Sequence, residues 1–143
     1  MGRFRGGLST RIHALVDAEG RPIRLTLTPG QAGDAPVGSD FAADLDAGAI
    51  LIADRAHDTN AYDTNDIRAG AEDRGVWTNI PPRVIRKDAF SFSPRVYRQR
   101  NLVERFFHRI KQIRGRATRY DRKPENHLAA LKLAAIRIWL ART

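Results

Sequence analysis

Length, composition and charge exclude several classes of protein for this chain. With 143 residues, 42% hydrophobic and 29% charged, it can bury one core and is too short for two ordinary domains. The absence of cysteine rules out disulfides and thiolate metal sites and favours a reducing, cytoplasmic location. No apolar run approaches the roughly 18 to 20 residues of a membrane span, and MGRFRGGLST lacks the apolar middle of a signal peptide. We therefore expect a soluble protein with no membrane partner.

The net charge of +9 is unevenly distributed along the chain. From Arg83 onward there are 17 Lys and Arg residues against 4 Asp and Glu, whereas the residues before Arg83 have 8 basic against 12 acidic side chains. Such an asymmetry attracts polyanions and makes binding sensitive to salt. The distribution predicts contact with nucleic acid, and the alternative is a well-solvated basic surface.

The first 30 residues predict a β-hairpin. RIHALV and PIRLTLT flank the turn-forming DAEGR, and the second run alternates apolar Ile23, Leu25 and Leu27 with polar residues. TPGQAGDAPVG then interrupts regular structure. SDFAADLDAG follows and predicts a short helix with Ser39 as its N-cap and Gly48 at its end.

Residues 49–80 predict a strand–helix–strand unit. AILIAD is a continuous apolar run of strand length that ends in Asp54, typical of a strand covered on both faces. The stretch from Ala61 to Arg74 is weakly helical, and VWTNI follows Gly75 as a short strand. A crossover of this length places the two strands parallel in one sheet.

Residues 95–143 predict two C-terminal helices, after the irregular and proline-bounded loop PPRVIRKDAFSFSP. The first helix runs from Tyr97 to about Arg114, and the second from Glu125 to about Ala141. The second has an apolar stripe made of Leu128, Leu131, Ala135, Ile138 and Trp139. The chain as a whole is therefore of the α/β class.

One line of polar side chains follows the first of these helices. At about 100° per residue, Tyr97, Arg100, Glu104 and Lys111 fall within about one-sixth of the circumference. Spacing alone fits a solvated face, because Arg100 and Glu104 at i, i+4 also form an ordinary stabilising pair. A site is the alternative, and Asp54 favours it because open α/β sheets usually hold ligands at the carboxyl ends of their strands. The opposite side of the helix is apolar: Leu102, Val103, Phe106, Phe107, Ile110 and Ile113.

Several segments, in their order along the chain, resemble the DDE transposases of bacterial insertion sequences. The sharpest is the signature of tyrosine, two residues, arginine, three residues, glutamate, six residues and lysine, which Tyr97, Arg100, Glu104 and Lys111 fit without a gap. The resemblance covers nearly the whole chain. It rests on GGLSTRIHALVD, PIRLTLTPGQ, LIADRAHD, IPPR, YRQRNLVERFFHRIKQIRGRATRYD and ALKLAAIRIWLA.

The resemblance implies a fold, a reaction and roles for residues. The fold would be RNase H-like, a mixed sheet with helices, and the reaction would be DNA strand cleavage and joining at transposon ends. In the family three carboxylates hold two divalent ions, usually Mg²⁺. Asp54 would be the second carboxylate and Glu104 the third, Arg100 and Lys111 would contact DNA phosphates, and Tyr97 would lie beside the scissile end.

The chain departs from the family pattern at the first aspartate. In the family this aspartate lies on a strand before the segment that corresponds to GGLSTRIH. None of the residues from Met1 to Leu8 is acidic, and Asp17 belongs to the predicted hairpin turn. The missing strand would be the central one, between the first hairpin strand and AILIAD. We therefore expect a second-frame or truncated product that is inactive alone. It would be completed by an upstream segment and would be a homo-oligomer when complete. A non-catalytic DNA-binding product or inhibitor, or a relic, is the alternative.

Two further polar features have weaker implications. His13 lies on the strand face opposite Ile12, Ala14 and Val16 and is expected to be a sheet-surface or packed histidine rather than a metal ligand. The cluster RGRATRYDRK, which includes Arg114 and Arg119, interleaves basic residues with Tyr120. That pattern suits contact with DNA phosphates and some stacking, and a solvated basic run fits it equally well.

Overall fold

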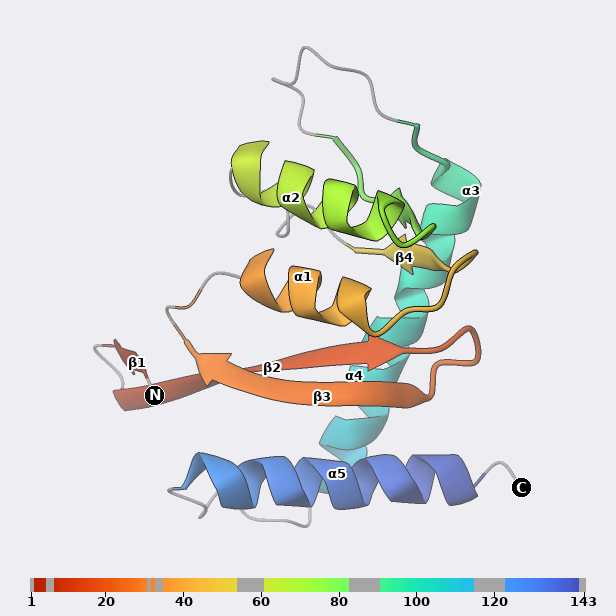
Figure 1. Cartoon of the computed structure of the whole chain (residues 1–143). Coiled ribbons are helices and arrows are strands. Elements are labelled where there is room, and N and C mark those ends of the chain that lie inside the picture. The colour runs from red at the N-terminus through yellow and green to blue at the C-terminus, as the bar shows by residue number, and fades with distance from the viewer. Residues whose placement is uncertain are drawn as a thin grey trace. The chain divides into compact units, whose positions relative to one another are not determined.

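A computed structural model describes residues 2–4, 7–30, 32, 35–53, 61–82, 91–114 and 123–141 (Figure 1). The chain divides into two compact units. Unit 1 comprises Met1–Ala32 and Asn101–Thr143, and unit 2 comprises Gly33–Arg100. Each unit has strands and helices, so the predicted α/β class is confirmed at that level. In the described part of the chain, no helix combines the length and apolar character needed to cross a membrane.

Unit 1 contains an antiparallel sheet of three strands in the order β1–β2–β3. β2 (Gly7–Val16) and β3 (Pro22–Pro29) are the predicted hairpin, and β1 (Gly2–Phe4), which was not predicted, pairs with β2. The turn is built on Asp17, whose Oδ1 accepts hydrogen bonds from the backbone N–H groups of Glu19 (2.9 Å) and Arg21 (2.8 Å). Gly20 completes it with a φ of 75°, a value that side chains with a Cβ rarely adopt.

A β-bulge interrupts the hairpin next to the turn. Leu15 pairs with Arg24 and Val16 with Pro22, so Ile23 is an extra residue with no partner across the ladder. Its side chain is 54% exposed, although the alternating pattern placed it with Leu25 and Leu27. Alternation alone would place Ile23 on one buried face with Leu25 and Leu27, and that interpretation is wrong for Ile23 because the bulge breaks the two-residue period.

The core of unit 1 lies between the hairpin and two helices, α4 (Asn101–Arg114) and α5 (Pro124–Leu140). Phe106 and Ile110 of α4 are buried with Leu131 and Ile138 of α5. The helices use the predicted apolar faces. Partly buried residues complete this cluster: Ile12, Ala14, Val16, Leu25, Leu27, Phe107 and Ile113.

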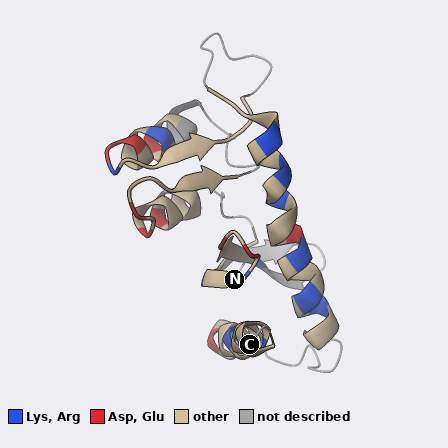
Figure 2. Ribbon diagram, turned by 90° about the vertical axis from the view of Figure 1, so that its right-hand side faces the viewer, with Lys and Arg blue, Asp and Glu red and all other residues tan. Residues whose placement is uncertain are grey.

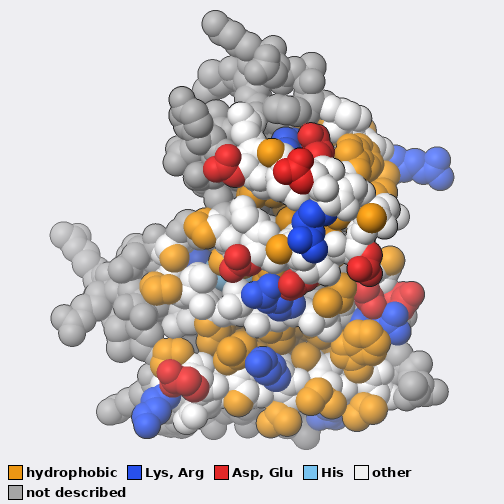
Figure 3. All heavy atoms as spheres, viewed as in Figure 1, with side chains coloured by type: hydrophobic (Ala, Val, Ile, Leu, Met, Phe, Trp, Pro, Cys, Tyr) orange, Lys and Arg blue, Asp and Glu red, His pale blue; other side chains and the backbone are white. Residues whose placement is uncertain are grey.

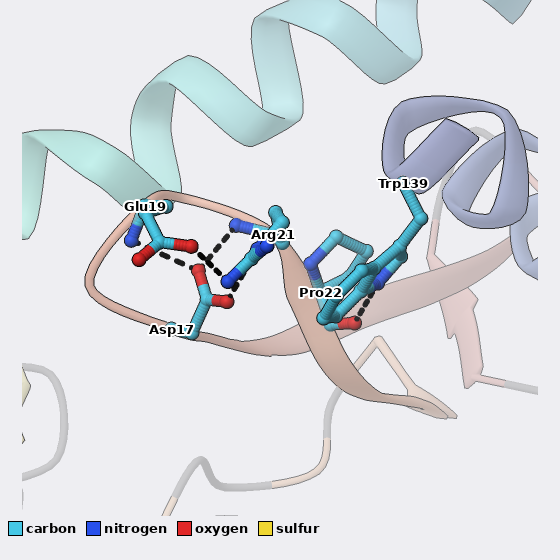
Figure 4. A network of polar contacts seen from close by, with 5 residues as sticks. All are labelled: Asp17, Glu19, Arg21, Pro22 and Trp139. Atoms are coloured by element: carbon cyan, nitrogen blue, oxygen red, sulfur yellow. Dashed lines mark hydrogen bonds and ion pairs between the residues drawn. The ribbon is translucent and has the colours of Figure 1, made fainter. Parts of the chain in front are cut away.

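The C-terminal end of α5 is tied to the hairpin by Trp139 (Figure 4). The indole Nε1 donates a hydrogen bond to the Pro22 carbonyl oxygen at 2.9 Å, and the Arg21 guanidinium carbon lies 4.4 Å from the centre of the ring. Asp17 Oδ2 accepts from Arg21 Nε at 2.7 Å, and Glu19 makes a second ion pair with Arg21. The turn and the helix end therefore form one polar network in which Arg21 has both carboxylate and aromatic partners.

α5 also has apolar side chains outside the core. Leu133, Ile136 and Leu140 are all more than half exposed and follow a spacing of three and four residues, which places them along one face of the helix. Hydrophobic side chains are visible along this helix in the space-filling view (Figure 3).

Unit 2 contains the predicted strand–helix–strand unit. β4 (Ile50–Ile52) and β5 (Trp77–Asn79) are parallel, with Ile50 opposite Trp77 and Ile52 opposite Asn79, and α2 (Ala61–Glu72) connects them. The described strands thus form two sheets, one antiparallel and one parallel. A central strand that would join them in one mixed sheet remains a prediction.

Two helix boundaries differ from the prediction. α1 (Ala35–Ala43) begins four residues before Ser39 and ends before Gly48, so Ser39 is not its N-cap. The earlier start allows Val37 and Phe41, one helical turn apart, to be buried on the same face. The helix predicted from Tyr97 to Arg114 is three consecutive segments: α3 (Pro94–Tyr97), the 3₁₀-helix η2 (Arg98–Arg100) and α4. The 3₁₀ turn lies where the chain passes from unit 2 to unit 1.

Candidate functional site

The carboxyl edge of the parallel strands is the first part of the candidate site. β4 ends at Ile52, and β5 runs in the same direction and ends at Asn79. The chain therefore leaves both strands at one edge of the sheet, the edge at which open α/β sheets usually place ligands. Asp54 follows β4 by two residues and lies outside the described residues. Its proposed role as a metal ligand stays a prediction.

Asn79, which was not predicted as a site residue, is the last residue of β5 and lies at this edge. Its side chain is completely buried, with 0% of the residue exposed. The carboxamide Nδ2 donates to the Ser93 carbonyl oxygen at 3.0 Å, and Oδ1 accepts from the Ser93 backbone N–H at 2.8 Å. A polar residue inside the apolar strand VWTNI is the sequence signal that could have indicated such a contact, because buried amides need partners.

Ser93 in turn begins the helical segment that contains Tyr97. It is the N-cap of α3, with its Oγ accepting from the Val96 N–H at 3.4 Å and Pro94 at the first helical position. Its carbonyl oxygen accepts the first helical hydrogen bond, from the Tyr97 N–H at 3.0 Å. The Tyr97 backbone is therefore attached directly to the residue that Asn79 holds.

Tyr97 and Arg100, two of the four signature residues, lie next to each other in unit 2. The Arg100 guanidinium carbon is 5.7 Å from the centre of the Tyr97 ring, within the range of a cation–π contact. The same ring meets Phe92 edge-on, with 5.4 Å between ring centres. Both residues are partly exposed, so an arginine and an aromatic ring are presented together to solvent.

Arg68 is a second buried polar residue of unit 2 that the sequence analysis missed. It lies on α2, is 5% exposed, and donates to the Thr78 hydroxyl at 3.1 Å and to the Ile80 carbonyl oxygen at 2.8 Å. These bonds tie α2 to the end of β5. Arg68 therefore fixes the carboxyl end of β5 to α2, the helix that connects β4 and β5.

The other two signature residues, Glu104 and Lys111, lie on α4 in unit 1. They are seven residues apart, so they lie on one face of the helix, and both are exposed. Phe106 and Ile110 on the opposite face are buried. Glu104 is in the first turn of α4, where the helix dipole favours a carboxylate. The other charged residues of α4 are basic, and Figure 2 shows Lys and Arg positions along the helices.

The remaining predicted residues are placed in part or not at all. Arg114 ends α4, and its side chain lies outside the described part of the structure, as does all of Arg119. Among the described residues no three His, Asp or Glu side chains gather in a way that could hold a metal ion. His13 is half-buried, and its Nε2 is 2.7 Å from the Thr28 hydroxyl, as expected of a packed histidine.

Comparison with known proteins agrees with the signature. Residues 2–139 match the model of the transposase DDE domain family. A protein of Brucella ovis named as a transposase for insertion sequence element IS6501 is 31% identical over 136 residues, which cover 93% of this chain and 99% of that protein. No solved structure matches. The chain therefore belongs to the family of DDE transposases of insertion sequences.

Proposed function

We propose that the chain supplies part of the catalytic site of a DNA transposase that cuts and joins strands at the ends of an insertion sequence. The observation that supports this most is the signature itself. Tyr97 and Arg100 are in contact at the start of the helical region, while Glu104 and Lys111 share the exposed face of α4. A solvated face would not require the ordered agreement with a transposase family over residues 2–139.

In this proposal Asp54 and Glu104 hold Mg²⁺. Carboxylate oxygens are the ligands that Mg²⁺ prefers, and the exposed Glu104 is accessible to a metal and to DNA. When bound, divalent ions activate an attacking oxygen and stabilise a leaving oxygen in phosphoryl transfer. The role of Arg100 and Lys111 is to neutralise DNA phosphates, with Arg114 and Arg119 extending the basic surface. Tyr97 packs beside the end of the DNA strand that is cut.

Two carboxylates are fewer than the three that this family uses. We propose that activity requires a further carboxylate from an upstream segment that carries the first aspartate. Such a segment would add the central strand of an RNase H-like sheet, between β2 and β4. The isolated chain would then be inactive, the completed protein would act as a homo-oligomer, and the site of action would be the cytoplasm, where the chromosome lies.

A second function is favoured by the charge distribution. The 17 basic residues from Arg83 onward suit DNA binding whether or not cleavage occurs. The chain alone would then occupy transposon ends without cutting them and would inhibit a complete transposase. A DNA-binding relic would have the same property without the regulatory role.

The decisive experiment replaces Glu104 by glutamine in the protein completed with the upstream segment. Glu104→Gln removes a metal-binding charge and changes almost no volume, so cleavage of transposon ends should be lost while DNA affinity stays within about twofold. Glu125→Gln is the matched control, because Glu125 is also an exposed carboxylate in the first turn of a helix. Mg²⁺-dependent cleavage by Glu104→Gln at the wild-type rate would remove Glu104 from the metal site.

A second assay separates the two functions. The isolated chain and the completed protein are mixed with labelled transposon ends and Mg²⁺, and cleavage and binding are measured for each. Cleavage by the completed protein supports the catalytic role, whereas binding without cleavage by both supports the inhibitor. Cleavage by the isolated chain would show that no further carboxylate is needed.

A further inference from the structure

Asn79 makes a two-point contact that is unusual for a strand residue. Its carboxamide donates through Nδ2 and accepts through Oδ1, and both bonds go to the backbone of the same residue, Ser93, 14 positions later. The side chain therefore pairs with Ser93 as one more peptide unit would in a β-ladder. Asn79 itself is completely buried, whereas Ser93 is partly exposed.

Ser93 is also hydrogen-bonded to Tyr97. Its carbonyl oxygen accepts from Asn79 Nδ2 at 3.0 Å and from the Tyr97 N–H at 3.0 Å, so one oxygen joins the strand end to the helical segment. The neighbouring Phe92 touches the Tyr97 ring edge-on. Tyr97 is thus fixed at its backbone through Ser93 and at its side chain through Phe92.

Arg100 contacts Tyr97 in turn. Its guanidinium lies over the Tyr97 ring, which limits where the cation can point. Asn79 is also paired in the parallel ladder with Ile52, which lies two residues before Asp54 in the sequence. One buried carboxamide therefore connects the strand edge that precedes Asp54 with the Tyr97–Arg100 pair.

We propose that Asn79 is a positioning residue that holds Tyr97 and Arg100 for contact with DNA at this edge. The inference rests on the proposed function, in which these two residues meet the DNA end. Loss of the carboxamide frees Ser93 from β5, so the start of α3 is no longer held and the Arg100 contact with phosphate weakens. Asn79 itself does not touch DNA.

A purely structural role for Asn79 makes a different prediction. If Asn79 only stabilised unit 2, its loss would lower stability, and its effect on DNA affinity would add to that of any other change at the interface. If it acts through Arg100, the two changes remove the same contact. A double-mutant cycle distinguishes these cases.

The experiment measures affinity of the full chain for a short duplex that carries the terminus of its own insertion sequence. Asn79→Ala and Arg100→Ala should each weaken binding by about tenfold, the size expected for one lost charge-assisted contact. The double variant should be no weaker than about tenfold to twentyfold, instead of the roughly hundredfold that independent effects would give. Lys111→Ala is the control partner, because Lys111 lies on α4 and its loss should combine with Asn79→Ala additively.

Asn79→Leu tests the same idea with a side chain of similar size. Leucine can neither donate to the Ser93 carbonyl oxygen nor accept from the Ser93 N–H. It should weaken binding as Asn79→Ala does, and the melting temperature of each variant shows which of them are folded. Full additivity of Asn79→Ala with Arg100→Ala, or wild-type affinity of a folded Asn79→Leu, would overturn the positioning role. No loss of affinity in Arg100→Ala alone would instead refute the proposed DNA contact of Arg100.

A measurement on the wild-type chain needs no variant. The Ser93 amide is held by a buried side chain, so its hydrogen exchange should be slowed at least tenfold relative to an unprotected amide of the same sequence. Exchange of Ser93 at the unprotected rate would show that the contact with Asn79 does not persist in solution. The inference would then fail independently of any DNA-binding result.

Discussion

Replacing Trp139 by phenylalanine tests how the C-terminal helix is attached to the hairpin. The change removes the indole N–H that bonds the Pro22 carbonyl oxygen at 2.9 Å and leaves that oxygen without this donor. It also weakens the contact with the Arg21 guanidinium, since phenylalanine has the smaller ring. The helix and its buried face, with Leu131 and Ile138, are otherwise unchanged.

The expected loss follows from these two contacts. A neutral hydrogen bond contributes about 1 kcal/mol, and a cation–π contact at a site as exposed as Trp139 contributes roughly 0.5 kcal/mol. The free energy of unfolding should therefore fall by about 1 to 2 kcal/mol. In a chain of this size that corresponds to a melting temperature lower by roughly 3 to 8 °C.

Thermal unfolding followed by far-UV circular dichroism measures this change. Leu133→Ala is the control on the same helix, because Leu133 is 68% exposed and its truncation should alter stability by less than about 0.5 kcal/mol. The remaining tryptophan, Trp77 in β5, allows unfolding of unit 2 to be followed by fluorescence in the same variant. A Trp139→Phe protein as stable as wild type would show that neither contact of the indole stabilises unit 1.

Two further predictions concern the core of unit 1 and the charge of the chain. Phe106→Ala should lower the free energy of unfolding by about 3 to 5 kcal/mol in chemical denaturation, because Phe106 is completely buried. His108→Ala, on the exposed side of α4, should change this free energy little, and similar losses in the two variants would contradict the assigned buried face. Affinity for a random-sequence duplex should fall linearly in a plot of log K against log salt concentration, with a slope of about −0.9 for each phosphate neutralised, and a flat titration would exclude the basic residues from the DNA surface.

The sequence was sufficient for features that depend on local patterns. The hairpin followed from RIHALV and the alternating run PIRLTLT on either side of DAEGR, and the parallel pair β4–β5 followed from two short apolar runs separated by a helix. The buried face of α4 followed from the helical spacing of Phe106 and Ile110. In each case the pattern of every element is local, and for the parallel pair the crossover rule supplies the pairing.

Features that depend on contacts between distant segments were not predicted. The Asn79–Ser93 pair joins residues 14 positions apart, and no periodicity marks it. The bulge that exposes Ile23 depends on pairing across the hairpin, and the early start of α1 depends on the burial of Val37. The 3₁₀ segment from Arg98 to Arg100 lies at the passage between the two units, and single-helix geometry could not locate it.

The division of the chain into units has a consequence for folding during synthesis. Unit 2 is continuous in sequence, but unit 1 joins Met1–Ala32 to Asn101–Thr143, and its Trp139–Pro22 bond spans 117 residues. The apolar face of the hairpin, including Ile12 and Leu25, packs against the buried residues of α4 and α5. On the ribosome this face stays uncovered by α4 and α5 while about 70 to 110 further residues are made, which takes roughly 4 to 20 seconds at about 5 to 20 residues per second. During this time the exposed hairpin face favours aggregation of the nascent chain, and slowing translation of the last helices would prolong that exposure.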